Sequence, residues 1–166
     1  NLVLSIGVLN ALTTSSARIA EMQRCFWERS FGTASCAQMI GRVRKLNAKE
    51  QELLFVAGLL HDIGVLFLLT QFTTPYLEIL KASHEQEVPL VIVERRSLHT
   101  DHAALGGMLA DKWSFPEGLR ELIAEHESPI IPDDFPSGAC LQMADRLVCS
   151  LNQSGHCGFT PALEPA

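Results

Sequence analysis

The sequence predicts an all-α protein, a compact bundle of several helices. Apolar residues recur at helical spacing along most of the chain, and no stretch shows the regular alternation expected of a half-buried β-strand. Hydrophobic residues make up 47% of the 166 residues and charged residues only 19%, a composition that can bury a core and argues against disorder. The length suits one domain, for which we expect residues 1–151, followed by a loosely held tail at 152–166.

The first part of the chain is predicted to be helical from its start. Residues 1–12 are apolar and begin without a capping residue. Residues 17–46 carry apolar side chains at helical spacing, with a bend expected at Gly32. Asn47 and Glu50 have the spacing of a capping box, which predicts that a new helix begins immediately after the asparagine.

The next segment, residues 53–69, is almost wholly apolar, and its length is at the lower limit for crossing a membrane. His61 and Asp62 lie at its centre, however, where an ionised aspartate costs roughly 2.5–3.5 kcal/mol on the insertion scale. Gly64 offers a break close to this pair. We therefore expect a buried helix that is interrupted near a polar site, and no insertion into a membrane.

Shorter helices are expected from about residue 74 onward, and several of them follow a start signal. Pro75 is expected at the first position of one helix, where its missing N–H is not needed, and Pro89 precedes another turn or helix. Thr100 or Asp101 can cap the helix that follows. The remaining expectations are a helix at 118–126, a proline-rich loop at 128–136 and a final helix near 137–151.

Charge and cysteine content narrow the class of function. Thirteen basic residues against nineteen acidic ones give a net charge of −6, the opposite of the usual balance in a protein that binds a nucleic-acid backbone. The five cysteines form no CxxC pair and have apolar neighbours, so we expect small thiols in a reducing compartment. The protein is accordingly predicted to be cytoplasmic, with no nucleic acid among its partners.

Polar residues in apolar surroundings are the candidates for chemistry. His61 and Asp62 are suitable ligands for Fe, Mn or Zn, although a buried hydrogen-bonded pair that fixes helix packing is the more common explanation of the dipeptide alone. Asp145 lies within an apolar helical pattern, where an ionised carboxylate needs a cation or several donors. His102 and His126 each lie at a predicted helix end, and either can be a simple helix-terminal histidine.

Three segments resemble the HD superfamily, whose members include helical, metal-dependent phosphohydrolases. These segments are AGLLHDIG at 57–64, the stretch 101–126, and MADRLV at 143–148. FWERS at 26–30 and DHAALG at 101–106 resemble its HDOD branch more closely. The resemblance implies an HD-like helical bundle used in bacterial signal transduction, beside sensor, regulator or output domains. It also implies that N-terminal helices of the full module are missing, so the chain is expected to be a fragment.

The resemblance also implies a set of metal ligands. His61 and Asp62 match the family's His-Asp pair, and Asp145 matches its late aspartate. His102 and His126 match further histidines of the cyclic-dinucleotide phosphodiesterases in the superfamily, where Glu125 replaces the first residue of a His-His pair.

One position departs from this pattern. When Trp27 and Ser30 are aligned with the family's Trp-x-x-Ser pattern, Arg29 stands at the position of the family's early histidine. An arginine stays protonated and has no lone pair to offer a metal. We hypothesise that its guanidinium replaces the ion as a buried counter-charge and pairs with Asp62 or Asp145. Glu28 becomes an alternative ligand if the alignment is displaced by one residue.

Two functions follow from these observations. The first is a non-catalytic HD-type signalling domain that acts by protein interaction or ligand binding, for which no cofactor is expected. The second is a metal-dependent phosphohydrolase acting on nucleotides or cyclic dinucleotides with Fe, Mn or Zn. A purely structural bundle is a third interpretation, and the sequence leaves open whether the chain forms a homo-oligomer.

Overall fold

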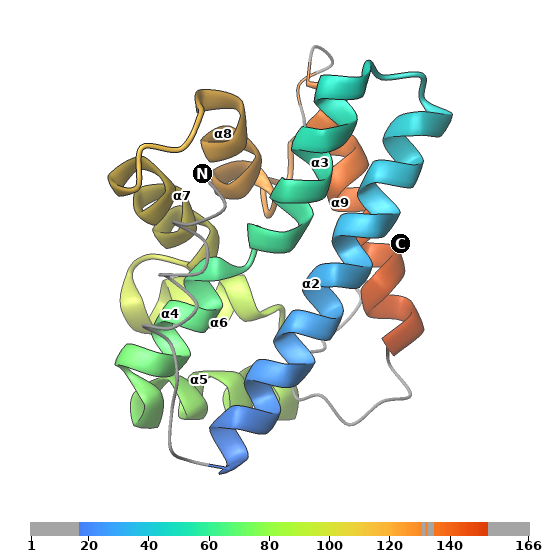
Figure 1. Ribbon diagram of the computed structural model, residues 1–166. Coiled ribbons are helices and arrows are strands. Elements are labelled where there is room, and N and C mark those ends of the chain that lie inside the picture. Colours follow the sequence, from blue (N-terminus) through green and yellow to red (C-terminus); the bar gives the residue numbers. More distant parts are fainter. Residues whose placement is uncertain (1–16, 131, 133–134, 153–166) are drawn as a thin grey trace.

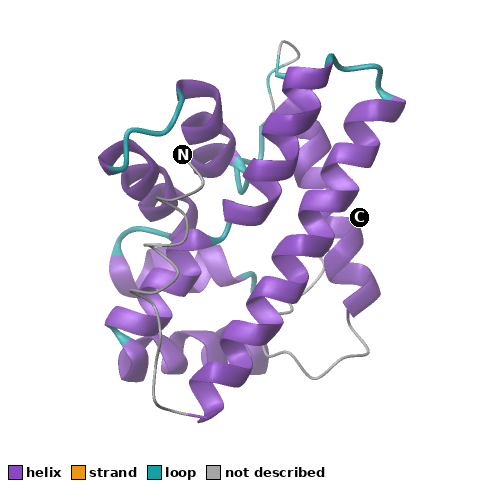
Figure 2. Cartoon of the chain, viewed as in Figure 1, coloured by secondary structure: helices purple, strands orange, loops and turns teal. Residues whose placement is uncertain are grey.

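The structure is a computed structural model that describes residues 17–130, 132 and 135–152. These residues form eight α-helices and no strand, so the all-α prediction is confirmed (Figures 1 and 2). The predicted helix at 1–12 and nearly all of the predicted tail lie outside the described residues. The helices are α2 (Ala17–Val43), α3 (Ala48–Leu60), α4 (Ile63–Gln71), α5 (Thr73–Gln86), α6 (Leu90–Leu98), α7 (His102–Lys112), α8 (Glu117–Glu125) and α9 (Pro136–Asn152).

Helix α2 is the longest described helix, and it packs against both α3 and α9 (Figure 1). The helix is not interrupted at Gly32, where a bend was predicted, because α2 is continuous through this residue. Gly32 instead faces α9, where an added Cβ would lie 3.3 Å from Val148 Cγ1. The capping box before α3 is confirmed: the Asn47 side chain accepts from Glu50 N at 3.0 Å, and Glu50 accepts from Asn47 N at 2.9 Å.

The predicted interruption of the apolar segment is confirmed, but it lies at His61 and Asp62 and not at Gly64, where the break was expected. Helix α3 ends at Leu60 and α4 begins at Ile63, so His61 and Asp62 form the turn between them. Gly64 lies inside α4 and permits a close approach to α7, because an added Cβ would overlap the backbone carbonyl of His102. The stretch 48–71 is long and apolar enough to cross a membrane by composition, yet 61% of its most apolar window is buried inside the molecule.

The shorter helices follow the predicted order, and one of them begins earlier in the sequence than predicted. Pro75 is the third residue of α5 rather than the first, because that helix begins at Thr73. Pro89 directly precedes α6, as predicted. Of the two capping candidates before α7 the cap is Asp101, whose side chain accepts from Ala104 N at 2.8 Å.

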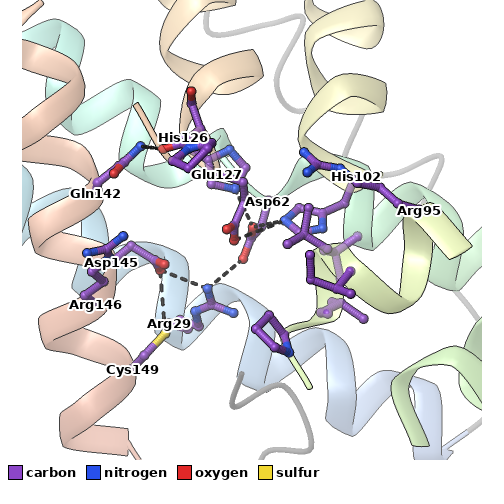
Figure 3. A pocket seen from close by; sticks show the side chains of 17 residues that line it. Arg29, Asp62, Arg95, His102, His126, Glu127, Gln142, Asp145, Arg146 and Cys149 are labelled. Carbon is purple, nitrogen blue, oxygen red and sulfur yellow. Dashed lines mark hydrogen bonds and ion pairs between the residues drawn. The ribbon is translucent and has the colours of Figure 1, made fainter. Parts of the chain in front are cut away.

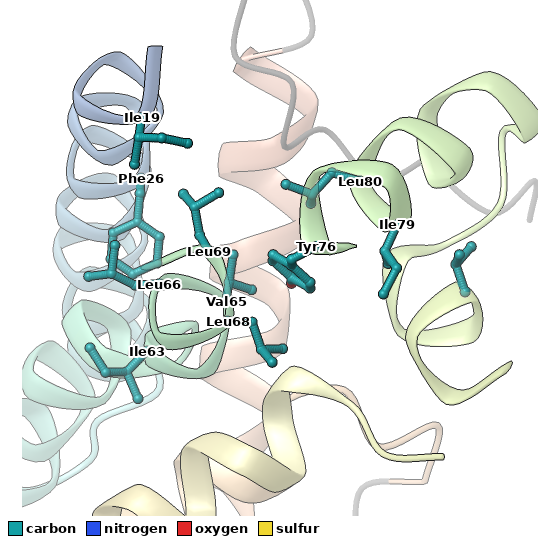
Figure 4. Packing of buried hydrophobic residues seen from close by; sticks show 11 residues of the cluster. Ile19, Phe26, Ile63, Val65, Leu66, Leu68, Leu69, Tyr76, Ile79 and Leu80 are labelled. Atoms are coloured by element: carbon teal, nitrogen blue, oxygen red, sulfur yellow. The ribbon is translucent and has the colours of Figure 1, made fainter. Parts of the chain in front are cut away.

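Two hydrophobic clusters hold the bundle together. The first surrounds α4 and includes Leu66, Leu69 and Tyr76 (Figure 4). The second joins α3 to α8 and α9 and includes Leu54 and Leu141. The turn between α3 and α4 therefore connects a helix of the second cluster to a helix of the first. The packing of these two helices holds the turn in place.

The cysteine prediction is only partly correct. Cys36, Cys140 and Cys149 are free thiols. Cys25 is disulfide-bonded, so the expectation of thiols alone is wrong at this position.

Candidate functional site

The polar residues singled out in the sequence meet at the turn between α3 and α4. His61 and Asp62 are buried there, and Asp62 is only 3% exposed. Side chains from four other parts of the chain reach the same point (Figure 3). They are Arg29 from α2, His102 from the start of α7, His126 and Glu127 after α8, and Asp145 from α9.

Arg29 binds two aspartates from different elements. Its Nη2 atom lies 2.8 Å from Asp145 Oδ1 and 3.1 Å from Asp62 Oδ2. The side chain of Arg29 is only 15% exposed, so these contacts are largely shielded from water. Burial alone would raise the pKa of Asp62 and of Asp145, but the Arg29 guanidinium, followed by His61, holds both well below the usual range. The pairing predicted for Arg29 is thus present, and it involves both aspartates.

His61 lies beside the same two carboxylates. Its Nε2 atom is 3.3 Å from Asp62 Oδ2 and 3.3 Å from Asp145 Oδ1. Its Nδ1–H donates to Gly58 O at 2.9 Å, which fixes the orientation of the ring. Burial lowers the pKa of His61, but the two carboxylates outweigh burial and raise it to about 10.

The other two histidines approach the second oxygen of Asp62. His126 Nε2 lies 3.2 Å from Asp62 Oδ1, and His102 Nε2 lies 3.5 Å from it. His126 Nδ1–H donates to Ile123 O at 2.8 Å. Glu127 completes this side of the site, with Oε1 3.7 Å from His102 Nε2.

His102 is positioned by a buried glutamate that the sequence analysis did not select. Glu94 Oε2 accepts from His102 N at 3.0 Å and from His102 Nδ1 at 2.6 Å. Glu94 Oε1 accepts from the Tyr76 hydroxyl at 2.5 Å. Glu94 is fully buried and directly follows the apolar residues 90–93 of α6, and a carboxylate at the end of an apolar run was the available signal.

Replacing Tyr76 by phenylalanine should lower the free energy of unfolding by roughly 1.5–3 kcal/mol, because it leaves Glu94 Oε1 buried without a donor. Urea denaturation followed by circular dichroism measures this change. Ser83→Ala is the matched control, since the Ser83 hydroxyl donates to the neutral carbonyl of Val88, and about 0.5–1.5 kcal/mol is expected there. Equal losses in the two variants would contradict a special role for Glu94.

Two sequence candidates do not belong to the site. Glu28 is exposed and pairs with Arg24, because one residue along a helix turns the side chain about 100° away from the direction of Arg29. Glu125 is also exposed, and only its backbone carbonyl is used, accepting from Gln142 Nε2 at 3.3 Å. Glu127, two residues later, is the glutamate that reaches the histidines. The suggestions of Glu28 and Glu125 as site residues are therefore corrected.

The position between Asp62 Oδ2 and Asp145 Oδ1 does not fit a metal ion. Arg29 Nη2 already lies within hydrogen-bonding distance of both oxygens, and a guanidinium nitrogen has no lone pair to donate. A divalent ion placed there would meet a fixed positive charge. The negative charges of Asp62 and Asp145 are therefore balanced by the Arg29 side chain of the protein itself.

A cavity of about 340 Å³ opens beside the site. Asp62, His102 and Glu127 line its polar part, and the segment 89–92 before and within α6 forms an apolar wall. Gln142 and Arg146 contribute from α9 (Figure 3). The site can therefore be reached by a small ligand.

A family model and one similar solved structure both identify the HDOD domain. The family model of the HDOD domain matches residues 1–129, a range that includes every site residue except Asp145. An HDOD domain protein of unknown function from Geobacter sulfurreducens has a similar structure, with a TM-score of 0.73 and 24% identity, covering 85% of this chain and 46% of that one.

Two further proteins are similar. The MmoQ response regulator from Methylococcus capsulatus strain Bath is 28% identical, with a TM-score of 0.63, covering 81% of this chain and 53% of that one. An uncharacterised protein of Treponema pallidum (strain Nichols) is 21% identical over 139 residues, which cover 81% of this chain and 26% of that protein. The chain thus spans about half of these solved structures and about a quarter of the curated relative.

Proposed function

The chain belongs to the HDOD family, and on that basis we propose that it is a non-hydrolytic HD-type domain of bacterial signal transduction, which acts by binding a protein or a small ligand. Its partners would be sensor, regulator or output domains. Support for a signalling role comes from the similar response regulator of Methylococcus capsulatus. The chain spans about half of that protein, so partners within a longer polypeptide are consistent with the proposal.

The observation that carries the proposal is the position of Arg29. Hydrolytic metal sites use ions to generate a hydroxide and to stabilise the charge that develops on the phosphoryl group. Arg29 occupies the space between Asp62 and Asp145, and it supplies positive charge without holding a water for attack. A domain with this arrangement keeps a charged, buried site but lacks one of the means of activating water.

Arg29→His should add one divalent ion per chain relative to the unmodified protein, because an imidazole in place of the guanidinium would join His61, Asp62 and Asp145 as a ligand. Elemental analysis after incubation with Mn²⁺ and gel filtration measures the gain. Arg24→His is the matched control on the exposed face of the same helix, where no gain is expected. An ion that the unmodified chain holds and that Asp145→Asn removes would contradict the proposal.

A metal-dependent phosphohydrolase remains the second candidate, because two groups of ligand-type side chains lie within reach of an ion. These groups are His61, Asp62 and His126, and His102, His126 and Glu127. Release of nitrophenol from bis(p-nitrophenyl) phosphate, and cleavage of a cyclic dinucleotide, both with Mn²⁺ present, distinguish the two functions. Turnover by the unmodified chain that is lost in Asp62→Asn would favour the hydrolase.

A further inference from the structure

The end of α2, the connection to α3 and the start of α3 carry an unusual concentration of positive charge. Residues 39–49 contain four basic residues and no carboxylate, although the whole chain has a net charge of −6. The four residues are all exposed, and they are Arg42, Arg44, Lys45 and Lys49. Together with the exposed Met39 and Val43 of the same segment, we name them the basic tip. Figure 1 shows this connection at one end of the bundle.

Two large apolar side chains of the basic tip face the solvent. Met39 is 64% exposed and Val43 is 75% exposed. They are four residues apart, so they lie on the same side of α2, and Val43 is the last residue of that helix. The helical rise separates them by about 6 Å along the axis. The basic tip therefore combines positive charge with a shallow apolar surface.

The stability of the fold explains only one of the four positive charges. Arg42 lies in the last turn of α2, where a cation interacts favourably with the helix dipole. Lys49 is the second residue of α3, at the end of a helix where a positive charge is unfavourable. Lys45 has a φ of 59°, a conformation that glycine adopts without steric cost. Helix formation therefore does not account for either lysine.

The four basic side chains also have no partner inside the molecule. Within the part of the chain that the structure describes, they form no ion pair and no side-chain hydrogen bond. Arg24, Arg29 and Arg95, by contrast, each contact a carboxylate. Contacts within the described chain therefore leave the charges of the basic tip free to adapt to an external partner. Such charges suit a diffuse negative surface, which does not require the fixed geometry of a paired guanidinium.

The position of the basic tip separates it from the charged site. The basic tip is at the start of α3, and the turn with His61 and Asp62 follows the end of the same helix. The 13 residues of α3 span about 20 Å. The residues that line the cavity do not include any residue of the basic tip. A contact at this end of the bundle therefore leaves the cavity accessible.

We propose that the basic tip binds the surface of an anionic lipid bilayer. Lysine and arginine clusters are attracted to anionic headgroups, and Met39 and Val43 add apolar burial at the boundary with the acyl chains. Charges more than about 8 Å from the surface are largely screened at physiological salt, so the net negative charge of the chain does not prevent this contact. The contact is peripheral and requires no helix to cross the membrane. The inference goes beyond the proposed function and does not depend on Arg29.

The test is sedimentation of the tag-free full chain with vesicles. One set contains equal parts of phosphatidylglycerol and phosphatidylcholine, and the other contains phosphatidylcholine alone. We expect binding to the anionic vesicles, at least about tenfold weaker binding to the neutral ones, and weaker binding in about 0.5 M NaCl. Lys45→Gln should reduce the partition coefficient about fivefold. Lys112→Gln is the matched control, since Lys112 is exposed on α7, outside the basic tip, and no change is expected.

A second pair of variants tests the apolar part of the basic tip. Met39→Ser should reduce the partition coefficient for anionic vesicles about tenfold, because it removes most of a side chain that the bilayer would bury. Met108→Ser is the matched control, since Met108 is 68% exposed on α7, and unchanged binding is expected. Circular dichroism verifies that all four variants are folded.

Three outcomes would overturn the inference. The first is no binding to anionic vesicles, or equal binding to both kinds. The second is an equal loss in the variants and their controls, which would show attraction by the chain as a whole. The third is binding to soluble polyglutamate that Lys45→Gln weakens, without binding to vesicles, which would identify an acidic protein segment as the partner. None of them bears on the metal gain expected in Arg29→His, so the proposed function is tested separately.

Discussion

Arg29→Met should lower the free energy of unfolding at neutral pH by about 3–5 kcal/mol, the usual cost of removing one partner from a buried ion pair. The methionine keeps much of the side-chain volume but leaves Asp62 and Asp145 facing each other with only His61 as a neighbouring positive charge. Urea denaturation in the presence of a chelator measures the effect and prevents an added ion from compensating. A loss below about 1 kcal/mol, the range of exposed pairs, would show that solvent already neutralises the two aspartates.

Arg24→Met is the control for this measurement. Arg24 lies in the same helix and also contacts two carboxylates, Glu21 and Glu28, but all three side chains are more than half exposed. Water and salt screen such pairs, so the unfolding midpoint should not change measurably. A loss of stability in Arg29→Met but not in Arg24→Met would identify burial of the ion pair as the cause of that loss.

The pH dependence of the Arg29→Met effect has a definite sign. Arg29 holds the pKa of Asp62 and of Asp145 below the ordinary value of 3.8, so the stability it contributes is fully present above that value. As the pH falls below about 4, the unfolded chain takes up protons that the folded carboxylates, with their lower pKa, do not, so that contribution is progressively lost. The difference between the unmodified chain and the variant should therefore narrow in acid, and a constant difference from pH 7 to pH 3 would contradict this explanation.

Gly64→Ala should be the second large effect, a loss of about 3 kcal/mol, at the upper end of the usual range for overpacking. An added Cβ at this residue would overlap the backbone carbonyl of His102, and a backbone atom cannot move away by changing rotamer. No described glycine has a positive φ, so steric overlap rather than backbone strain causes the loss. Because the displaced residue is His102, the variant should also weaken any ligand binding at the site.

Gly118→Ala is the matched control for Gly64→Ala. An added Cβ at Gly118 would lie 3.3 Å from Leu53 Cδ2, the end of a flexible side chain that can move. Alanine is also the better helix former by roughly 1 kcal/mol, so this variant should be neutral or slightly stabilised. Similar losses in the two variants would show that the contact between α4 and α7 is not a tight one.

The elements that could be predicted from the sequence are those set by local chemistry. The capping box at Asn47 and the cap at Asp101 depend on residues within one turn of the chain, and both are present. The polar interruption at His61 and Asp62 was also visible, because an ionisable pair within an apolar run is costly anywhere in a protein. Arg29 was found only through a family resemblance, since nothing in its immediate sequence indicates that it is buried.

The remaining features depend on contacts between distant residues. Glu94 is paired with Tyr76 and His102, which lie 18 and 8 residues away, and only the folded bundle brings them together. The choice between Glu125 and Glu127 depends on where α8 ends, and the end of a helix is poorly specified by sequence. Helix α5 begins at Thr73, two residues before the start that was predicted at Pro75, and the reason is the same.

The turn that carries His61 and Asp62 has a mechanical consequence. One of the flanking helices is anchored in the cluster around Leu66 and the other in the cluster around Leu54. Close-packed interiors pass on displacement, so a shift of Asp62 is transmitted to the packing of both clusters. The charged site thus lies where the two halves of the hydrophobic core are joined by the chain.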